Sequence, residues 1–228
     1  MAKPGELAGL IAELFGAEVP TVRAQARELR DHDYMAKEKG GRGSGSMTAR
    51  DAAHLLVAAA GTNSVRKSVD VIHRPGQFIS RAGKWKLAFL PIPEMIELPS
   101  NHTLIDAVEA LIRAGIDGTL QEEANKVSGA AVDLVHDLAP DTQIEVSLVG
   151  PMPSAAIKIG LLTRGEHGEP IEDTDAQELH RYGGIERRGN LSGIDIATRD
   201  ELEIDLRSEF RFTHRSIMRI ARLLDGAV

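Results

Sequence analysis

The chain has 228 residues, of which 42% are hydrophobic and 27% are charged, a balance that excludes wholesale disorder. It contains no Cys, which excludes disulfides, thiolate zinc sites, iron–sulfur clusters and Cys nucleophiles. The length allows one large domain or two small ones. The N-terminus has no apolar signal core and no apolar run reaches about 18 residues, so we expect a bacterial-type cytoplasmic protein.

The formal net charge of −7 is unevenly distributed along the chain. Residues 1–74 carry 11 Lys and Arg against 9 Asp and Glu, whereas residues 75–228 carry 16 against 25. Within residues 34–50 the single acid, Glu38, is outnumbered by four basic residues: Lys37, Lys39, Arg42 and Arg50. This pattern indicates a small basic element attached to an acidic body.

The N-terminal segment predicts two helices joined by a short turn. Apolar residues at positions i, i+3, i+4 and i+7 predict a helix over residues 6–14, and Gly16 is suited to end it. Pro20 suits the first turn of a second helix that runs to about His32, with an inner face of Val22, Ala26 and Leu29. Two helices with such a turn form a helix-turn-helix arrangement.

A short strand is predicted over residues 34–39, followed by a Gly-rich loop over residues 40–46. Thr48 is a natural N-cap for a third helix, with Asp51 three residues on. The buried side of that helix is predicted to consist of Leu55, Leu56, Ala59 and Ala60. A polar helix is predicted over residues 64–73.

Pro75 and Gly76 adjoin where the charge balance shifts, so we expect one domain over residues 1–74 and a second over residues 75–228. The second region is expected to be mixed α+β. Its predicted strands are residues 85–89, 94–98, 144–149, 155–162, 194–196 and 202–206. Its predicted helices are residues 100–114, residues 119–138 and a closing helix after Thr213 that buries Ile217, Ile220, Ala221 and Leu224. Residues 164–174 are expected to form a polar loop.

The second predicted helix carries Arg23, Arg27 and Arg30 on one face, about 90° from its apolar face. A helix with this stripe can enter the major groove of DNA or contact phosphates, and Thr21 and Gln25 are predicted to reach base edges. The Gly-rich loop suits close approach to phosphates and a narrow minor groove. Its predicted contacts are Lys37, Lys39, Arg42, Ser44 and Ser46.

The order of helix, turn, Arg-bearing helix, short strand and Gly-Arg-Gly loop resembles the winged helix-turn-helix domains of bacterial and bacteriophage transcription regulators. The resemblance covers about residues 5–60, and it departs from the family pattern because the strand after the loop is very short. The resemblance implies an N-terminal winged helix-turn-helix domain that binds double-stranded DNA sequence-specifically as a homodimer, with residues 21–30 as recognition helix and residues 37–46 as wing. Together with the mixed α+β region that follows, whose expected role is oligomerisation or regulation, the chain is expected to be an α+β protein.

Three other functions remain open on the sequence. A phage DNA-packaging or assembly factor would use the same helix-turn-helix to select viral DNA, and a protein-interaction module without DNA affinity would fit the negative net charge. Glu201, Glu203 and Asp205 alternate on a predicted strand and could hold Mg²⁺ in a nuclease, although an outward polar face explains them more simply.

The sequence shows no catalytic motif that leads us to expect an enzyme or a cofactor. The Gly-rich loop has the glycine spacing of a phosphate-binding loop, but Ser46 stands where that motif requires Lys. The eight His residues never pair at i, i+3 or i+4, so no helical metal-binding face is predicted.

Overall fold

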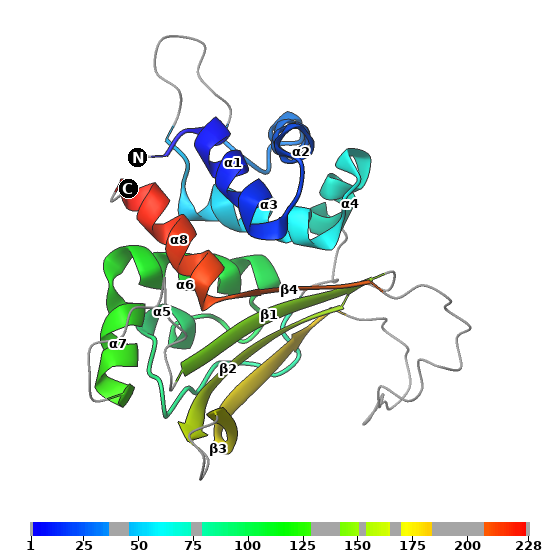
Figure 1. Cartoon of the computed structure of the whole chain (residues 1–228). Helices are drawn as coiled ribbons and strands as arrows, with labels where there is room; N and C mark the ends of the chain where they lie inside the picture. The colour runs from blue at the N-terminus through cyan, green and yellow to red at the C-terminus, as the bar shows by residue number, and fades with distance from the viewer. Residues whose placement is uncertain are drawn as a thin grey trace, which may run out of the picture.

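The computed structural model describes residues 2–36, 46–73, 79–128, 142–150, 154–164, 170–183 and 208–226. Along the chain, a run of helices is followed by the four strands of one antiparallel sheet and then by a last helix, so the expected α+β class is confirmed (Figure 1). The helical elements are α1 (Pro4–Phe15), α2 (Val19–Asp31), α3 (Ala49–Gly61), the 3-10 helix η1 (Val65–Lys67), α4 (Ser68–His73), α5 (Pro93–Ile96), α6 (Leu104–Asp117), α7 (Thr119–Ser128) and α8 (His214–Asp225). The strands are β1 (Thr142–Gly150), β2 (Ser154–Arg164), β3 (Pro170–Tyr182) and β4 (Ser208–Thr213).

The first two predicted helices and their short turn are confirmed. Gly16 ends α1 with a φ of 60°, a left-handed conformation that glycine adopts without a steric cost. Pro20 lies in the first turn of α2, where its missing N–H leaves no intrahelical bond unmade. Val22, Ala26 and Leu29 are buried as expected.

The strand expected over residues 34–39 is not formed by its described part. Residues 34–36 form a bend, and Met35 at 3% exposure anchors that bend in the core. Residues 37–45 lie outside the described residues. Residues 46–48 lead into α3 without forming a strand, so neither strand of a wing is present among the described residues.

Helix α3 is the centre of the molecule. Every residue from Asp51 to Ala60 is buried, although only one face was expected to be. A helix that is apolar on all sides is stable only when it is surrounded. Helices α1, α2 and α4 contact α3, as do α6, α8, β1 and β4. One hydrophobic core therefore includes residues on both sides of the domain boundary expected near residue 74, and residues 74–78 lie outside the described part.

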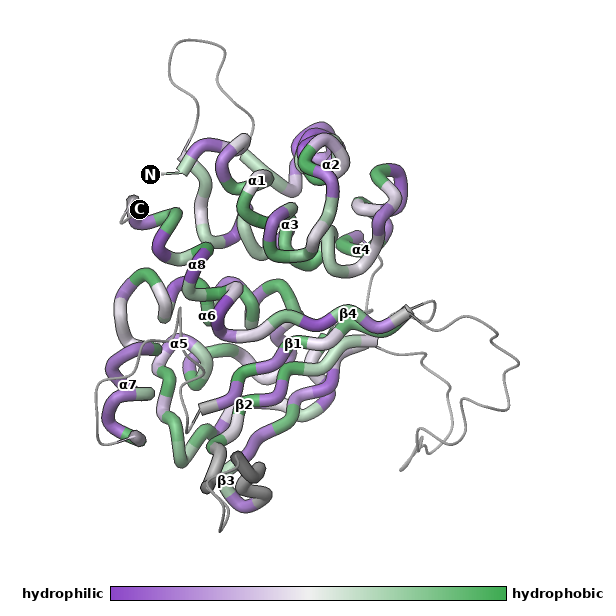
Figure 2. Tube along the Cα trace, viewed as in Figure 1, coloured by the Kyte–Doolittle hydropathy of each residue, from purple (hydrophilic) through white to green (hydrophobic). Residues whose placement is uncertain are grey.

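The sheet has the strand order β3-β2-β1-β4, with every neighbouring pair antiparallel. Alternate residues of β1 and β2 are buried in the core, and Figure 2 shows hydrophobic and hydrophilic residues alternating along these strands. Helices α3 and α8 pack against β1 and β4. The buried residues of the sheet include Ile144, Val146, Leu148, Ala155, Ile157, Ile159 and Phe212. The strands predicted at residues 144–149 and 155–162 are thus confirmed.

Several predictions for the second region are wrong. Residues 85–89 form no strand, because Leu87 adopts a left-handed φ of 36° that an extended strand cannot contain. Residues 94–98 overlap the short helix α5, whose first turn contains Pro93. Residues 170–174 belong to β3 and not to a loop, and β4 was not predicted. The strands predicted at residues 194–196 and 202–206, with residues 129–138, lie outside the described residues.

Helices α6 and α8 close the core. Helix α6 begins at Leu104 and not at residue 100, because the hydroxyl of Thr103 caps it and Asp106 completes a capping box. Thr213 is the N-cap of α8. The expected buried face of α8, Ile217, Ile220, Ala221 and Leu224, is confirmed.

Candidate nucleic-acid interface

Helix α2 presents two exposed cations on the side that faces away from the core. Arg23 and Arg27 are exposed and lie four residues apart, so their side chains are neighbours on one face of the helix. Neither has a carboxylate partner among the residues that the structure describes. The structure therefore brings together two of the residues predicted for DNA contact.

The base-reading role expected of Gln25 is contradicted. Its side chain is 1% exposed, and its Nε2 donates to the backbone carbonyl oxygen of Thr62 at 2.7 Å. Gln25 lies two residues from Arg23 and two from Arg27, which is about 200° around the helix in each case. The amide consequently points into the protein when the two Arg side chains point outward.

The other two predicted contacts on α2 are partly buried. Thr21 is two residues before Arg23, so it lies on a different side of the helix from the exposed Arg pair. Arg30 continues the Arg face by one turn, and its Nε donates to the carbonyl of Ala26 at 3.3 Å. Arg30 therefore lies beside the exposed pair but folds back along its own helix.

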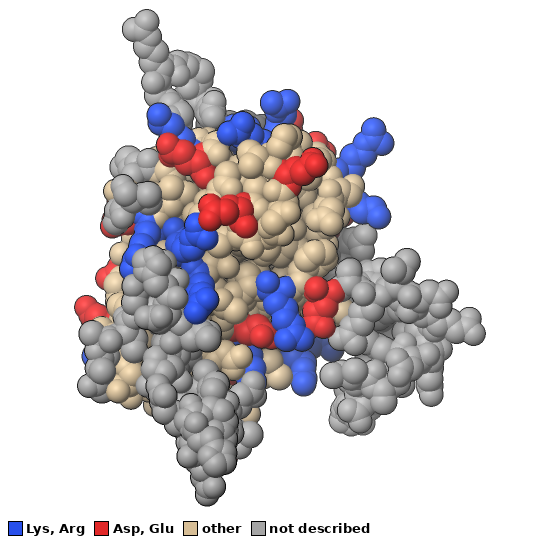
Figure 3. Space-filling view, viewed as in Figure 1, with Lys and Arg blue, Asp and Glu red and all other residues tan. Residues whose placement is uncertain are grey.

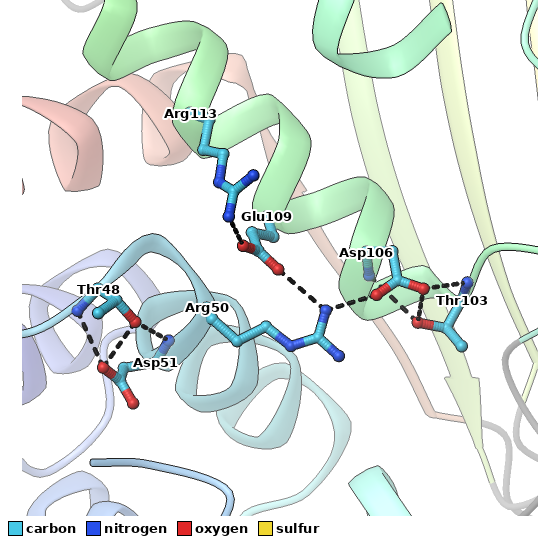
Figure 4. Close-up of polar contacts among 7 residues, drawn as sticks. All are labelled: Thr48, Arg50, Asp51, Thr103, Asp106, Glu109 and Arg113. Atoms are coloured by element: carbon cyan, nitrogen blue, oxygen red, sulfur yellow. Dashed lines mark hydrogen bonds and ion pairs between the residues drawn. The ribbon is translucent and has the colours of Figure 1, made fainter. Parts of the chain in front are cut away.

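The predicted loop contacts are only partly covered by the structure. Lys37, Lys39, Arg42 and Ser44 lie outside the described residues, whereas Ser46 is described and exposed. The two ends of this loop are held by one carboxylate. Asp51 Oδ1 accepts the N–H of Ala36 at 2.8 Å, and its Oδ2 accepts the N–H and the hydroxyl of Thr48 at 2.9 and 2.7 Å (Figure 4).

Two further cations, which were not predicted from the sequence to contact DNA, lie on an element next to α2. Arg66 and Lys67 are exposed residues of η1, and η1 contacts α2. No carboxylate in the described part of the chain pairs with either of them. Their adjacency in the sequence was the one available signal, and the fold brings their helix η1 into contact with α2, the helix that carries Arg23 and Arg27. We call these four residues the α2–η1 patch.

The surroundings of the patch are mixed in charge. Figure 3 shows Lys and Arg side chains around α2 and α4, with acidic side chains on the neighbouring surface. The exposed acids of these elements are Glu18, Asp31 and Asp70. The patch is therefore a small basic area on a surface of mixed charge.

An ion-pair network fixes α3, which supports the patch, against α6. Arg50 Nη1 donates to Asp106 Oδ1 at 2.5 Å and to Glu109 Oε2 at 2.9 Å (Figure 4). Burial disfavours the charged Asp106 carboxylate, but hydrogen bonds from Arg50 and from Thr103 outweigh burial and lower the pKa of Asp106. The network joins the helical layer to the second half of the chain.

No metal site accompanies the patch: across the described ranges, no group of three or more His, Asp and Glu residues could hold a metal ion. The strand predicted to carry Glu201, Glu203 and Asp205 lies outside those ranges. None of the helices in the described part is both long and apolar enough to cross a bilayer.

Comparison with known protein families, with curated proteins and with solved structures finds no match for this chain. The function is therefore inferred from the arrangement of its own residues.

Proposed function

We propose that this protein binds double-stranded DNA in a sequence-specific manner through the α2–η1 patch, as a bacterial or phage transcription regulator of the winged helix-turn-helix type. The observation that carries the proposal is the patch itself. Arg23, Arg27, Arg66 and Lys67 are exposed, lie on two elements in contact and have no carboxylate partner in the described structure.

The chemistry of the patch suits a phosphate backbone. Each Lys or Arg that neutralises a phosphate releases condensed counterions, which is the main source of nonspecific DNA affinity. Arg can also donate two parallel hydrogen bonds to a phosphate or to a guanine edge. Because the opposite side of α2 is packed in the core, the helix presents its Arg pair on a rigid support.

The distribution of charge supports the same function. The chain as a whole carries a net charge of −7, so the bulk of its surface repels DNA. A local basic patch on an acidic molecule orients the approach of a duplex toward that patch. A regulator of this type acts as a homodimer on a paired site, in which each copy supplies one α2 helix to one half-site.

The test is duplex binding by the full chain at several salt concentrations. The double variant Arg23→Ala/Arg27→Ala should weaken binding by about tenfold or more at moderate salt, and the slope of log affinity against log salt should fall by about 2. The double variant Arg66→Ala/Lys67→Ala should behave in the same way.

The matched control is Lys84→Ala/Lys86→Ala, which removes two exposed cations from another part of the surface. It should leave affinity and salt slope unchanged. Wild-type affinity in the Arg23→Ala/Arg27→Ala variant, with the fold intact, would overturn the proposal. An equal loss of DNA affinity in the control variant would show that net charge, and not the α2–η1 patch, determines binding.

A further inference from the structure

Six side chains form a polar cluster between residues 79–102 and the end of β3, which the predictions from sequence did not include. His180 and Tyr182 reach it from the buried face of β3, and Glu178 precedes them on that face. The remaining members are Ser80, Trp85 and His102; we call the six the His180 cluster. Its rings are at most 2% exposed, whereas Ser80 is partly exposed.

The Glu178 carboxylate of the cluster is held by several hydrogen bonds. Its carboxylate accepts the backbone N–H of Lys86 at 3.0 and 3.1 Å, that of Leu87 at 2.6 Å, and a hydrogen bond from His180 Nε2 at 2.7 Å. These three donor groups hold the carboxylate in one position. An ionised carboxylate only accepts, so Nε2 of His180 carries a hydrogen and, in the neutral ring, Nδ1 is the acceptor.

Nδ1 of His180 faces a hydroxyl. Ser80 Oγ lies 3.5 Å from it and donates to the carbonyl oxygen of Gly83 at 3.2 Å, so the hydroxyl hydrogen has to turn from that carbonyl toward Nδ1 before His180 can take it. The indole of Trp85 stacks on the imidazole with ring centroids 3.5 Å apart and planes 5° from parallel, so the ring cannot turn away. Burial lowers the pKa of His180, although its bond to Glu178 acts in the opposite direction. The ring is thus a neutral base at pH 7.

We propose that Ser80 is a nucleophile for acyl transfer from small uncharged carboxylic esters, with His180 as its base and Glu178 as a positioning residue. A hydroxyl beside a neutral imidazole that is oriented by a carboxylate is the arrangement that activates serine. Such bonds are commonly long in the absence of substrate and tighten when it binds. Ser80 is partly exposed whereas the rings beside it are buried, so a substrate can reach the hydroxyl from solvent.

The turn that follows Ser80 supplies further donors. The backbone N–H groups of Ala82, Gly83 and Lys84 donate to no acceptor in the part of the chain that the structure describes.

The reaction balances without any further reagent than water. Ser80 Oγ bonds to the carbonyl carbon as its proton passes to His180 Nδ1. The bond from that carbon to the alcohol oxygen then breaks, and the departing alcohol takes the proton from Nδ1. Water attacks the acyl-serine by the same route, which releases the carboxylic acid and restores the hydroxyl. Glu178 stays ionised throughout.

The test uses the full chain with a fluorophosphonate probe and with p-nitrophenyl acetate as substrate. Mass spectrometry of peptides should find the adduct on Ser80, and Ser80→Ala should lower ester hydrolysis by about 100-fold or to background. Ser147→Ala is the matched control, because Ser147 is also a partly exposed serine but lies on the outward face of the sheet. This variant should still form the adduct on Ser80 and should hydrolyse the ester at the wild-type rate.

Glu178→Gln distinguishes positioning from structural support. Loss of the carboxylate removes a group that raises the pKa of His180, so the acid limb of the pH–rate profile should move to lower pH as kcat falls by about tenfold. A folded wild-type chain without an adduct on Ser80, or Ser80→Ala with the wild-type rate, would overturn the proposal. An unchanged pH profile in Glu178→Gln would overturn the role of Glu178.

Discussion

The side-chain amide of Gln25 donates to the backbone carbonyl of Thr62 at 2.7 Å and thereby ties α2 to the segment that leads into η1. The amide is buried, so the bond lies behind the α2–η1 patch and not within it. A residue expected to read DNA bases instead joins α2 to the segment that precedes η1.

Gln25→Ala should therefore reduce stability more than it reduces binding. The variant leaves the partly buried Thr62 carbonyl without the donor that Gln25 provides, which costs about 1 kcal/mol of unfolding free energy. Arg27→Ala should show the opposite pattern, with unchanged stability and weaker DNA binding, because its side chain is exposed. Urea denaturation and duplex titration of both variants check this. If Gln25→Ala were as stable as the wild type, the hydrogen bond from Gln25 to Thr62 would contribute nothing to the packing of α2.

A second prediction concerns Asp51, the carboxylate that holds both ends of residues 37–47. Asp51→Ala removes the acceptor for the N–H groups of Ala36 and Thr48 and half of a capping box, so unfolding free energy should fall by about 2 kcal/mol. Asp51→Asn keeps one carbonyl acceptor and should lose less.

The control for Asp51 is Asp70→Ala, an exposed acid in the first turn of α4. It should change stability by less than about 0.5 kcal/mol. If Asp51→Ala and Asp70→Ala were equally stable in urea denaturation, the carboxylate would have no part in holding the loop ends.

The helices could be predicted because their signals are local. Gly16, Pro20, Thr48 and Thr213 mark termini through their own backbone and side-chain preferences. Strand β3 could not be predicted, because at its end the usual pattern of buried apolar and exposed polar residues is reversed. His180 and Tyr182 on one face carry polar atoms and are buried, whereas the apolar Leu179 on the other face is 42% exposed. Pairing with β2 and the ring stack on Trp85 determine this strand, and neither is visible in a short window of sequence.

The candidate interface was predictable in part for the same reason. Arg23 and Arg27 belong to one helix face, which periodicity reveals. The prediction for Gln25 was wrong because the buried face of α2 includes this polar residue as well as its apolar residues. Arg66 and Lys67 join the patch only through the packing of η1 on α2, which is a tertiary contact.

A third prediction uses two helical glycines with opposite surroundings. A Cβ at Gly115 on α6 would lie 2.8 Å from the Cβ of Ala221 and 3.2 Å from Met218 Sδ, both on α8. Gly115→Ala should push α6 and α8 apart and cost about 1–3 kcal/mol. Gly9 on α1 has no atom within 4 Å of such a Cβ, so Gly9→Ala should stabilise by up to about 1 kcal/mol. Thermal denaturation that ranks the two variants in the reverse order would contradict this packing.

The last prediction concerns acid sensitivity, to which the buried imidazoles of His214 and His54 contribute. His214 is 1% exposed and neither ring nitrogen has a partner in the described structure, and burial lowers its pKa to about 4. Burial likewise lowers the pKa of His54 to about 4. An unfolded imidazole has a pKa of about 6.5, so between pH 6.5 and 4 the unfolded chain binds protons that the folded chain does not. Stability should therefore fall as pH falls through this window.

Each of the two imidazoles should contribute about 2 kcal/mol to the loss of stability between pH 7 and pH 5. His214→Leu should remove one of these contributions, so that its urea midpoint changes less with pH than that of the wild type. His32→Gln, at an exposed position of the chain, should retain the full dependence. The measurement is urea denaturation of the three proteins at both pH values. If His214→Leu lost as much stability as the wild type, the imidazole would be charged in the folded chain, and a partner for it would have to exist.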